Sequence, residues 1–159
     1  MNTFSTPDGP ASAYLRAVVA VLGPDTWDTS GFTWPERYVT APEVALCIGL
    51  HGTHVLIWNP FAGGWSCDRI DAQGHMLDEA HQLIEGEAVP RPSTVMAAVR
   101  LQYLGRLDEL PLPSYEPPVP AWVQLTPAQQ RMVDRGALTE DVARRLAVYA
   151  EEERALART

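Results

Sequence analysis

The chain has 159 residues, of which 46% are hydrophobic and 20% are charged, and its net charge is −8 at pH 7. This length and composition predict one ordinary domain, or a small domain with an appendage, and exclude a chain that is disordered overall. The negative charge disfavours nonspecific binding to a nucleic acid backbone by the molecule as a whole.

Neither a membrane segment nor a disulfide framework is expected. The apolar run at residues 17–22 is too short for a signal peptide, and no stretch approaches the roughly 20 apolar residues of a membrane span. Two cysteines, Cys47 and Cys67, do not make a disulfide framework. We therefore expect a cytoplasmic protein with both thiols reduced.

Residues 1–10 are predicted to be a flexible N-terminus, followed by an amphipathic helix. Ser12 is a suitable N-cap and Gly23 a suitable C-terminal stop. Between them, four aliphatic residues recur at the spacing of one helix face: Leu15, Val18, Val19 and Leu22. This face is expected to pack on a sheet.

Residues 44–58 predict two strands joined by a two-residue turn, His51-Gly52. Pairing Leu50 with Thr53 fixes the register of the whole hairpin. The face then expected to lie against the helices carries Leu46, Ile48, Val55 and Ile57. The opposite face carries Cys47, His54, Leu56 and Trp58.

A third strand is expected at residues 65–70, and residues 76–84 fit either a helix or an edge strand. Ser93 is then the expected N-cap of a helix whose apolar side carries Met96, Val99, Tyr103 and Leu107. Residues 11–109 thus predict an α+β domain, a small antiparallel three-stranded meander with flanking helices packed on one face.

Residues 110–120 contain five prolines and predict an extended linker. Residues 121–159 predict a helical hairpin appended to the domain. Thr126 and Gln129 form a capping box around Pro127, Gly136 ends the first helix, and Thr139 caps the second.

Several short motifs resemble an actinobacterial family classed as a domain of unknown function. They are Leu56-Ile57-Trp58-Asn59 at the end of an aliphatic strand, the pair Gly64-Trp65, and a Pro-x-Pro helix entrance at residues 90–92. Asn59 stands where that family has aspartate. The resemblance covers roughly residues 11–107; it implies a small α+β domain and brings no activity with it.

The soft ligands Cys47, His54 and Cys67 are of the types that zinc prefers, which gives one alternative, a small zinc protein or an enzyme. Their spacing matches no standard zinc motif, and packed thiols with exposed histidines are the favoured interpretation. The chain has no Ser-His-Asp signature, phosphate-binding glycine loop or dinucleotide fingerprint. We therefore expect a protein that is not an enzyme and has no cofactor.

Aromatic residues gather in and around the loops and strand ends, where side chains often anchor protein partners. The candidates for partner binding are Trp27, Phe32, Trp34, Trp58, Phe61 and Trp65. A structural role is the competing interpretation, and it is weighted toward Trp58 and Trp65.

The C-terminal hairpin resembles a helix-turn-helix in outline, with Arg144 and Arg145 on its second helix. This favours a second alternative, a DNA-associated regulator, although Glu140 and Asp141 would repel phosphates there. The leading hypothesis is a non-enzymatic protein-interaction module, an adaptor or chaperone-like factor that binds another protein through an acidic, aromatic surface.

Overall fold

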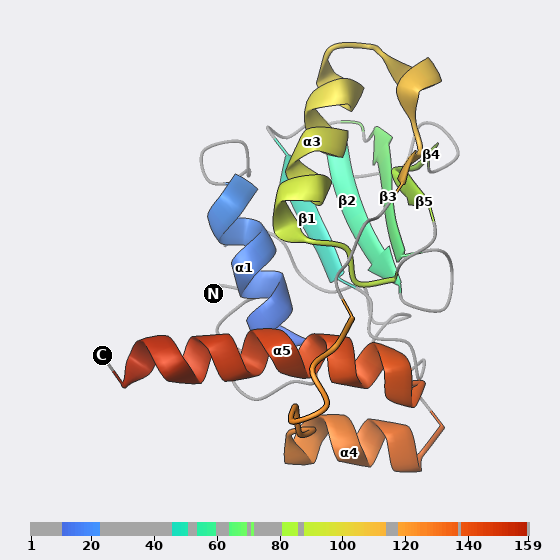
Figure 1. Ribbon diagram of the computed structural model, residues 1–159. Helices are drawn as coiled ribbons and strands as arrows, with labels where there is room; N and C mark the ends of the chain where they lie inside the picture. The colour runs from blue at the N-terminus through green and yellow to red at the C-terminus, as the bar shows by residue number, and fades with distance from the viewer. Residues whose placement is uncertain are drawn as a thin grey trace.

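A computed structural model describes residues 11–22, 46–50, 54–59, 64–69, 71, 81–85, 88–113, 118–136 and 138–158 (Figure 1). The described part is a mixed α/β structure. Its α-helices are α1 (Ser12–Leu22), α3 (Pro92–Tyr103), α4 (Pro127–Asp134) and α5 (Glu140–Ala157), with a short 3-10 helix at Leu107–Glu109.

The main sheet contains β1 (Leu46–Leu50), β2 (His54–Asn59), β3 (Gly64–Arg69) and β4 (His81–Gln82), in that order and with antiparallel neighbours. A separate parallel pair joins β5 (Ile84–Glu85) to β6 (Leu112–Pro113). The sheets therefore differ from the expected three-stranded meander by an added edge strand and by this parallel pair. For residues 76–84, where the sequence fits either a helix or an edge strand, His81–Gln82 and Ile84–Glu85 form strands, and residues 76–80 lie outside the described part.

The register of the first hairpin is displaced by one residue from the predicted one. Leu50 pairs with His54 and Leu46 with Trp58, so three residues rather than two connect the strands. A displacement of one residue exchanges the two faces of a strand. The residues of β2 packed in the core are Leu56 and Trp58, and the prediction that placed these two on the face away from the helices is wrong. The observed register buries the indole, the side chain with the most apolar area to remove from water.

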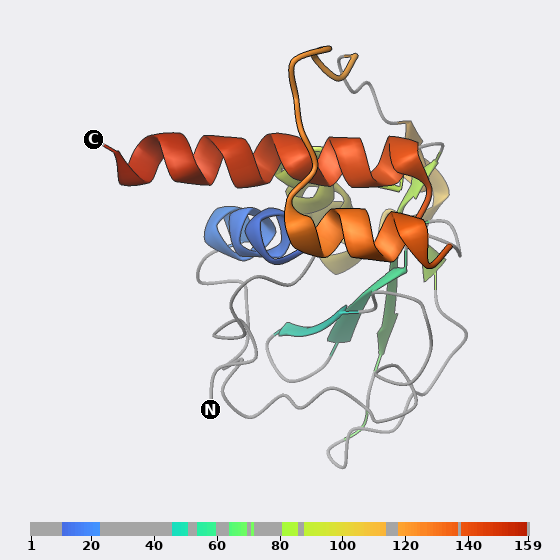
Figure 2. The ribbon, with the colours of Figure 1, turned by 90° about the horizontal axis from the view of Figure 1, so that it is seen from below.

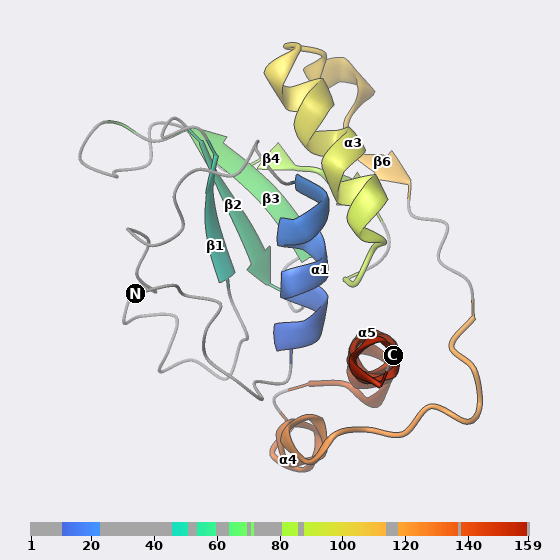
Figure 3. The same cartoon turned by 90° about the vertical axis from the view of Figure 1, so that its left-hand side faces the viewer.

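Helices α1 and α3 lie on the same face of the sheet (Figure 3). The predicted stripe on α1 is confirmed, since Leu15, Val18 and Leu22 are buried and Val19 packs against the core. Tyr14, on the same helix, is also fully buried. Seen from below, α5 crosses beside α1, and α4 packs alongside α5 (Figure 2).

The start of α3 differs from the expected one. Its N-cap is Arg91, with Pro92 in the first turn, so the prediction of Ser93 as N-cap is wrong. Proline has a fixed φ and no N–H, which suits the first helical position, and it holds the preceding residue in extended geometry. Arg91 has this geometry, with φ −58° and ψ 143°.

The helical signals of the C-terminal segment are confirmed. Thr126 and Gln129 form a reciprocal capping box, and the Thr139 hydroxyl accepts the backbone N–H of Val142. Gly136 has φ +73°, the left-handed conformation that commonly ends a helix. The buried residues of α5 include Ala143 and Leu146, which belong to the same core as α1 and the sheet. Helix α5 is thus part of the common core.

Candidate functional site

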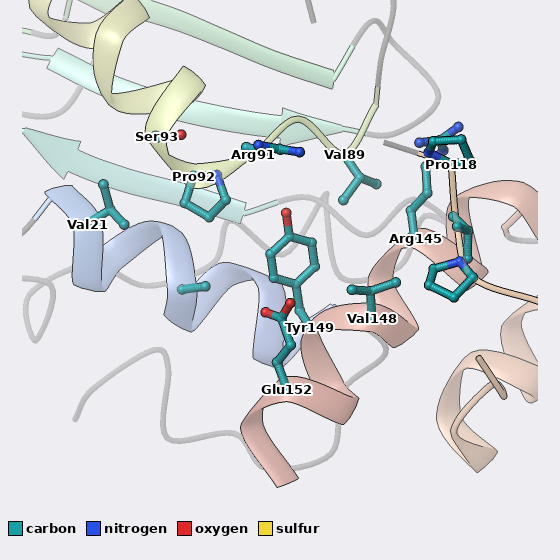
Figure 4. A pocket seen from close by; sticks show the side chains of 13 residues that line it. Val21, Val89, Arg91, Pro92, Ser93, Pro118, Arg145, Val148, Tyr149 and Glu152 are labelled. Carbon is teal, nitrogen blue, oxygen red and sulfur yellow. The ribbon is translucent and has the colours of Figure 1, made fainter. Parts of the chain in front are cut away.

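A pocket of about 590 Å³ lies between α1, the start of α3, α5 and residues 118–120 (Figure 4). Its apolar lining comprises Ala17, Val21, Val89, Pro92, Pro118, Val119, Pro120 and Val148. Its polar and charged lining comprises Arg91, Ser93, Arg145, Tyr149 and Glu152. Largely apolar walls with a few polar groups are typical of sites for small ligands and peptide segments.

Helical periodicity brings most of these side chains together. On α5, Val148 and Tyr149 lie three and four residues after Arg145, and Glu152 lies seven residues after it, so they share one face. On α1, Ala17 and Val21 are four residues apart and share a face in the same way. The pocket therefore forms where one stripe of α5 faces one stripe of α1.

The wall formed by residues 118–120 is fixed to α5. Arg144 donates from Nη2 to the carbonyl oxygen of Pro120 at 3.2 Å. The same carbonyl accepts the backbone N–H of Val123, also at 3.2 Å, and Val123 is buried. These contacts hold the proline-rich segment against the rest of the protein at this point.

The pocket rests on a hydrogen-bonded aromatic core. The ring of Tyr149 meets the ring of Tyr14 edge-on, with centroids 4.9 Å apart. The Tyr14 hydroxyl donates to the carbonyl oxygen of Pro90 at 2.6 Å and accepts from Trp65 Nε1 at 2.8 Å. Trp58 Nε1 donates to the carbonyl oxygen of Ala88 at 2.6 Å. These contacts join the floor of the pocket to the buried core.

The charged residues of the lining are unevenly distributed. The Arg145 side chain is 19% exposed and pairs through Nε with Asp141 at 3.0 Å. In Figure 4, Arg91 and Arg145 lie toward Val89 and Pro118, whereas Glu152 lies beyond the Tyr149 ring. The pocket therefore has a positive end and a negative end.

The neighbouring acid, Glu153, has a different role. It pairs with Arg16 of α1 in a two-point contact, at 2.6 Å to Nη2 and 2.8 Å to Nε. The hydrogen bond and the charge of Arg16 lower the pKa of Glu153 from its ordinary value, against a smaller opposing effect of burial. This pair joins α1 to α5 beside the pocket.

The structure places two of the six candidate aromatic residues, Trp58 and Trp65, in the core, where both are buried. This burial agrees with the structural role, the interpretation that the sequence analysis weighted toward these two residues. Their indole N–H groups are used inside the protein, which explains why burial is tolerated. Trp27, Phe32, Trp34 and Phe61 lie outside the described residues.

The register does not bring the proposed zinc ligands together. Cys67 pairs with Leu56 and is buried. Cys47 pairs with Ile57, the residue after Leu56 on β2, so the two cysteines do not lie opposite the same residue of that strand. His54 pairs with Arg69, two positions along from Cys67. Within the described part of the chain, no group of three or more metal-binding side chains occurs.

The two arginines of the DNA-binding alternative have contacts within the protein. Arg144 holds the carbonyl of Pro120, and Arg145 lines the pocket and pairs with Asp141. Glu140 and Asp141 are exposed in the first turn of α5, where they add negative charge. The arrangement therefore gives both arginines a part in building the pocket.

One exposed aromatic residue was missed by the sequence interpretation. Trp122 follows the wall at residues 118–120 and is 67% exposed. A tryptophan between Pro120 and the start of α4 was the available signal, but residues 110–120 were interpreted as a linker and the tail only as helices. The structure shows an indole presented to solvent beside an anchored turn.

No protein family, curated protein or solved structure matches the chain in the comparisons. The resemblance to an actinobacterial family consequently stays a prediction. Among the described helices, none combines the length and the apolar character needed to cross a bilayer.

Proposed function

We propose that the protein is a non-enzymatic protein-interaction module, an adaptor or chaperone-like factor, whose partner is anchored by Trp122. The observation that carries this proposal is the 67% exposure of this tryptophan. Tryptophan is among the residues most enriched at the energetic centres of protein interfaces. Because Trp122 is exposed, its indole does not contribute to the core.

The setting of Trp122 supports the same proposal. The preceding carbonyl, of Pro120, accepts both the Arg144 guanidinium and the Val123 N–H, and Val123 itself is buried. Because the turn is fixed before binding, a partner does not have to order it, and the conformational entropy lost on association is reduced. The net charge of −8 favours a partner with a basic surface, whose approach would be accelerated at low salt.

We place this function in the cytoplasm, with both cysteines as thiols. The free thiol of Cys67 lies in the core, where it behaves as a small apolar side chain. Trp34 and Phe61, which the sequence also offers as partner-binding residues, lie outside the described part.

Capture of partners from the cells that make the protein tests the proposal. The tagged chain is compared with Trp122→Ala and with Leu104→Ala. Leu104 is 68% exposed and lies at the end of α3, so this variant removes an equally exposed apolar side chain elsewhere. We expect the specifically bound protein to disappear from Trp122→Ala alone. The same bound proteins on all three chains, or equal losses from both variants, would reject Trp122 as the anchor.

A further inference from the structure

We propose that the pocket between α1, α3 and α5 binds an apolar monocarboxylate, with the carboxylate directed toward Arg91 and Arg145. The ligand class is a carboxylic acid with an aliphatic or aromatic body, as a free acid or as the end of a peptide chain. This site is distinct from the Trp122 contact and does not depend on it.

The size and walls of the pocket define the body of the ligand. The volume of about 590 Å³ falls within the range of roughly 300–1,000 Å³ found for small-molecule sites. Val21, Val89 and Val148 offer aliphatic surface, and Pro118 and Pro120 add rigid apolar surface. A hydrocarbon chain or ring entering this space removes apolar area from water on both sides of the contact.

The charges define the head group. Arg91 and Arg145 carry permanent positive charge, and guanidinium groups recognise carboxylates with charge-assisted hydrogen bonds. The Arg145 side chain is four-fifths shielded from solvent, so its field inside the pocket is screened less than that of a surface charge. The two guanidinium groups, one of them also paired with Asp141, lie together in the lining of the pocket although the net charge of the protein is −8.

Glu152 gives the site its polarity. It lies seven residues after Arg145 on the same helix, which places it roughly 10 Å along the helix axis. A second carboxylate reaching that end would meet the charge of Glu152. The site should therefore select an acid with one carboxylate over a dicarboxylate of the same length.

Calorimetric titration of the full chain with octanoate, octanamide and the dicarboxylate suberate tests these points. We expect octanoate to bind at least about tenfold more tightly than octanamide, because the neutral amide lacks the charge-assisted bond. We expect suberate to bind more weakly than octanoate, and this difference to shrink in Glu152→Gln. The same titration with acetyl-Leu-Val, which has a free carboxylate, and with its amide shows whether the end of a peptide binds more tightly than a free acid.

Variants locate the site. Arg91→Gln changes an exposed residue whose side chain makes no cap hydrogen bond to α3, and we expect it to weaken octanoate binding at least about tenfold. Arg106→Gln is the matched control, because Arg106 is also exposed, pairs with Glu109 and lies beyond the opposite end of α3. Its effect should be less than about twofold.

Three results would overturn the proposal. They are equal affinity for octanoate and octanamide, equal loss from Arg91→Gln and Arg106→Gln, and an absence of binding by both octanoate and acetyl-Leu-Val up to roughly 10 mM. Suberate binding as tightly as octanoate would overturn the role of Glu152. None of these results bears on the partner captured through Trp122.

Discussion

Replacing Tyr14 with phenylalanine tests the hydrogen-bonded core on which the pocket rests. The change removes one hydroxyl and leaves the ring, so it creates almost no cavity. It deprives two buried groups of their partners, the carbonyl of Pro90 and the indole N–H of Trp65. Each buried group left without a partner costs about 1–3 kcal/mol, so the expected loss is about 2–6 kcal/mol.

Urea unfolding measures this loss. Domains of ordinary size are stable by roughly 5–15 kcal/mol, so the variant should still fold. With m near 1–3 kcal/mol/M, a loss of about 3 kcal/mol lowers the midpoint by about 1–3 M while m is unchanged. Trp122→Phe, an aromatic change at an exposed position, should remain within about 0.5 kcal/mol.

A loss below about 1 kcal/mol from Tyr14→Phe would refute the reasoning, because it would mean that water satisfies both groups. A double-mutant cycle with Trp65→Phe separates the pair from the rest of the core. If Tyr14 and Trp65 are bonded as described, the two losses should fail to add by about 1 kcal/mol or more.

Three further outcomes are expected. Leu146→Ala should lower the free energy of unfolding by about 2–5 kcal/mol, because α5 shares the core, whereas exposed Leu156→Ala should change it by less than about 0.5 kcal/mol in the same urea assay. Thr139→Ala should cost about 1 kcal/mol through the lost N-cap of α5, measured as a fall in the thermal midpoint. The Glu153 carboxyl of the Arg16–Glu153 pair has a lowered pKa in the folded state. At pH values above the ordinary pKa of glutamate, the pair should contribute less than about 1 kcal/mol to the free energy of unfolding. That contribution is lost as the pH falls through the lowered pKa, and Glu153→Gln should abolish this part of the pH dependence of stability.

The helices were largely predictable because their signals are local. The stripe on α1, the capping box at Thr126 and the N-cap at Thr139 each lie within a few adjacent residues. Gly136 likewise marked a helix end without any knowledge of the fold. The start of α3 was misplaced because a serine was weighted above the constraint that Pro92 imposes on Arg91.

The register and the site depended on contacts between distant residues. A turn of two residues and a connection of three are both compatible with the hairpin sequence, and the choice between them decides whether Trp58 enters the core. Nothing local in α5 indicates that it packs on α1, or that Arg144 binds the carbonyl of Pro120. The pocket is made by these long-range contacts, so no sequence motif marked it.

The affinity of the captured partner for the wild-type protein and for Trp122→Ala tests the central claim most directly. An interface anchored by an exposed tryptophan typically loses at least about 2 kcal/mol on truncation to alanine, which corresponds to roughly a 30-fold rise in Kd. We expect that rise for Trp122→Ala and no comparable change for Leu104→Ala. A rise of less than about threefold for Trp122→Ala would contradict the account.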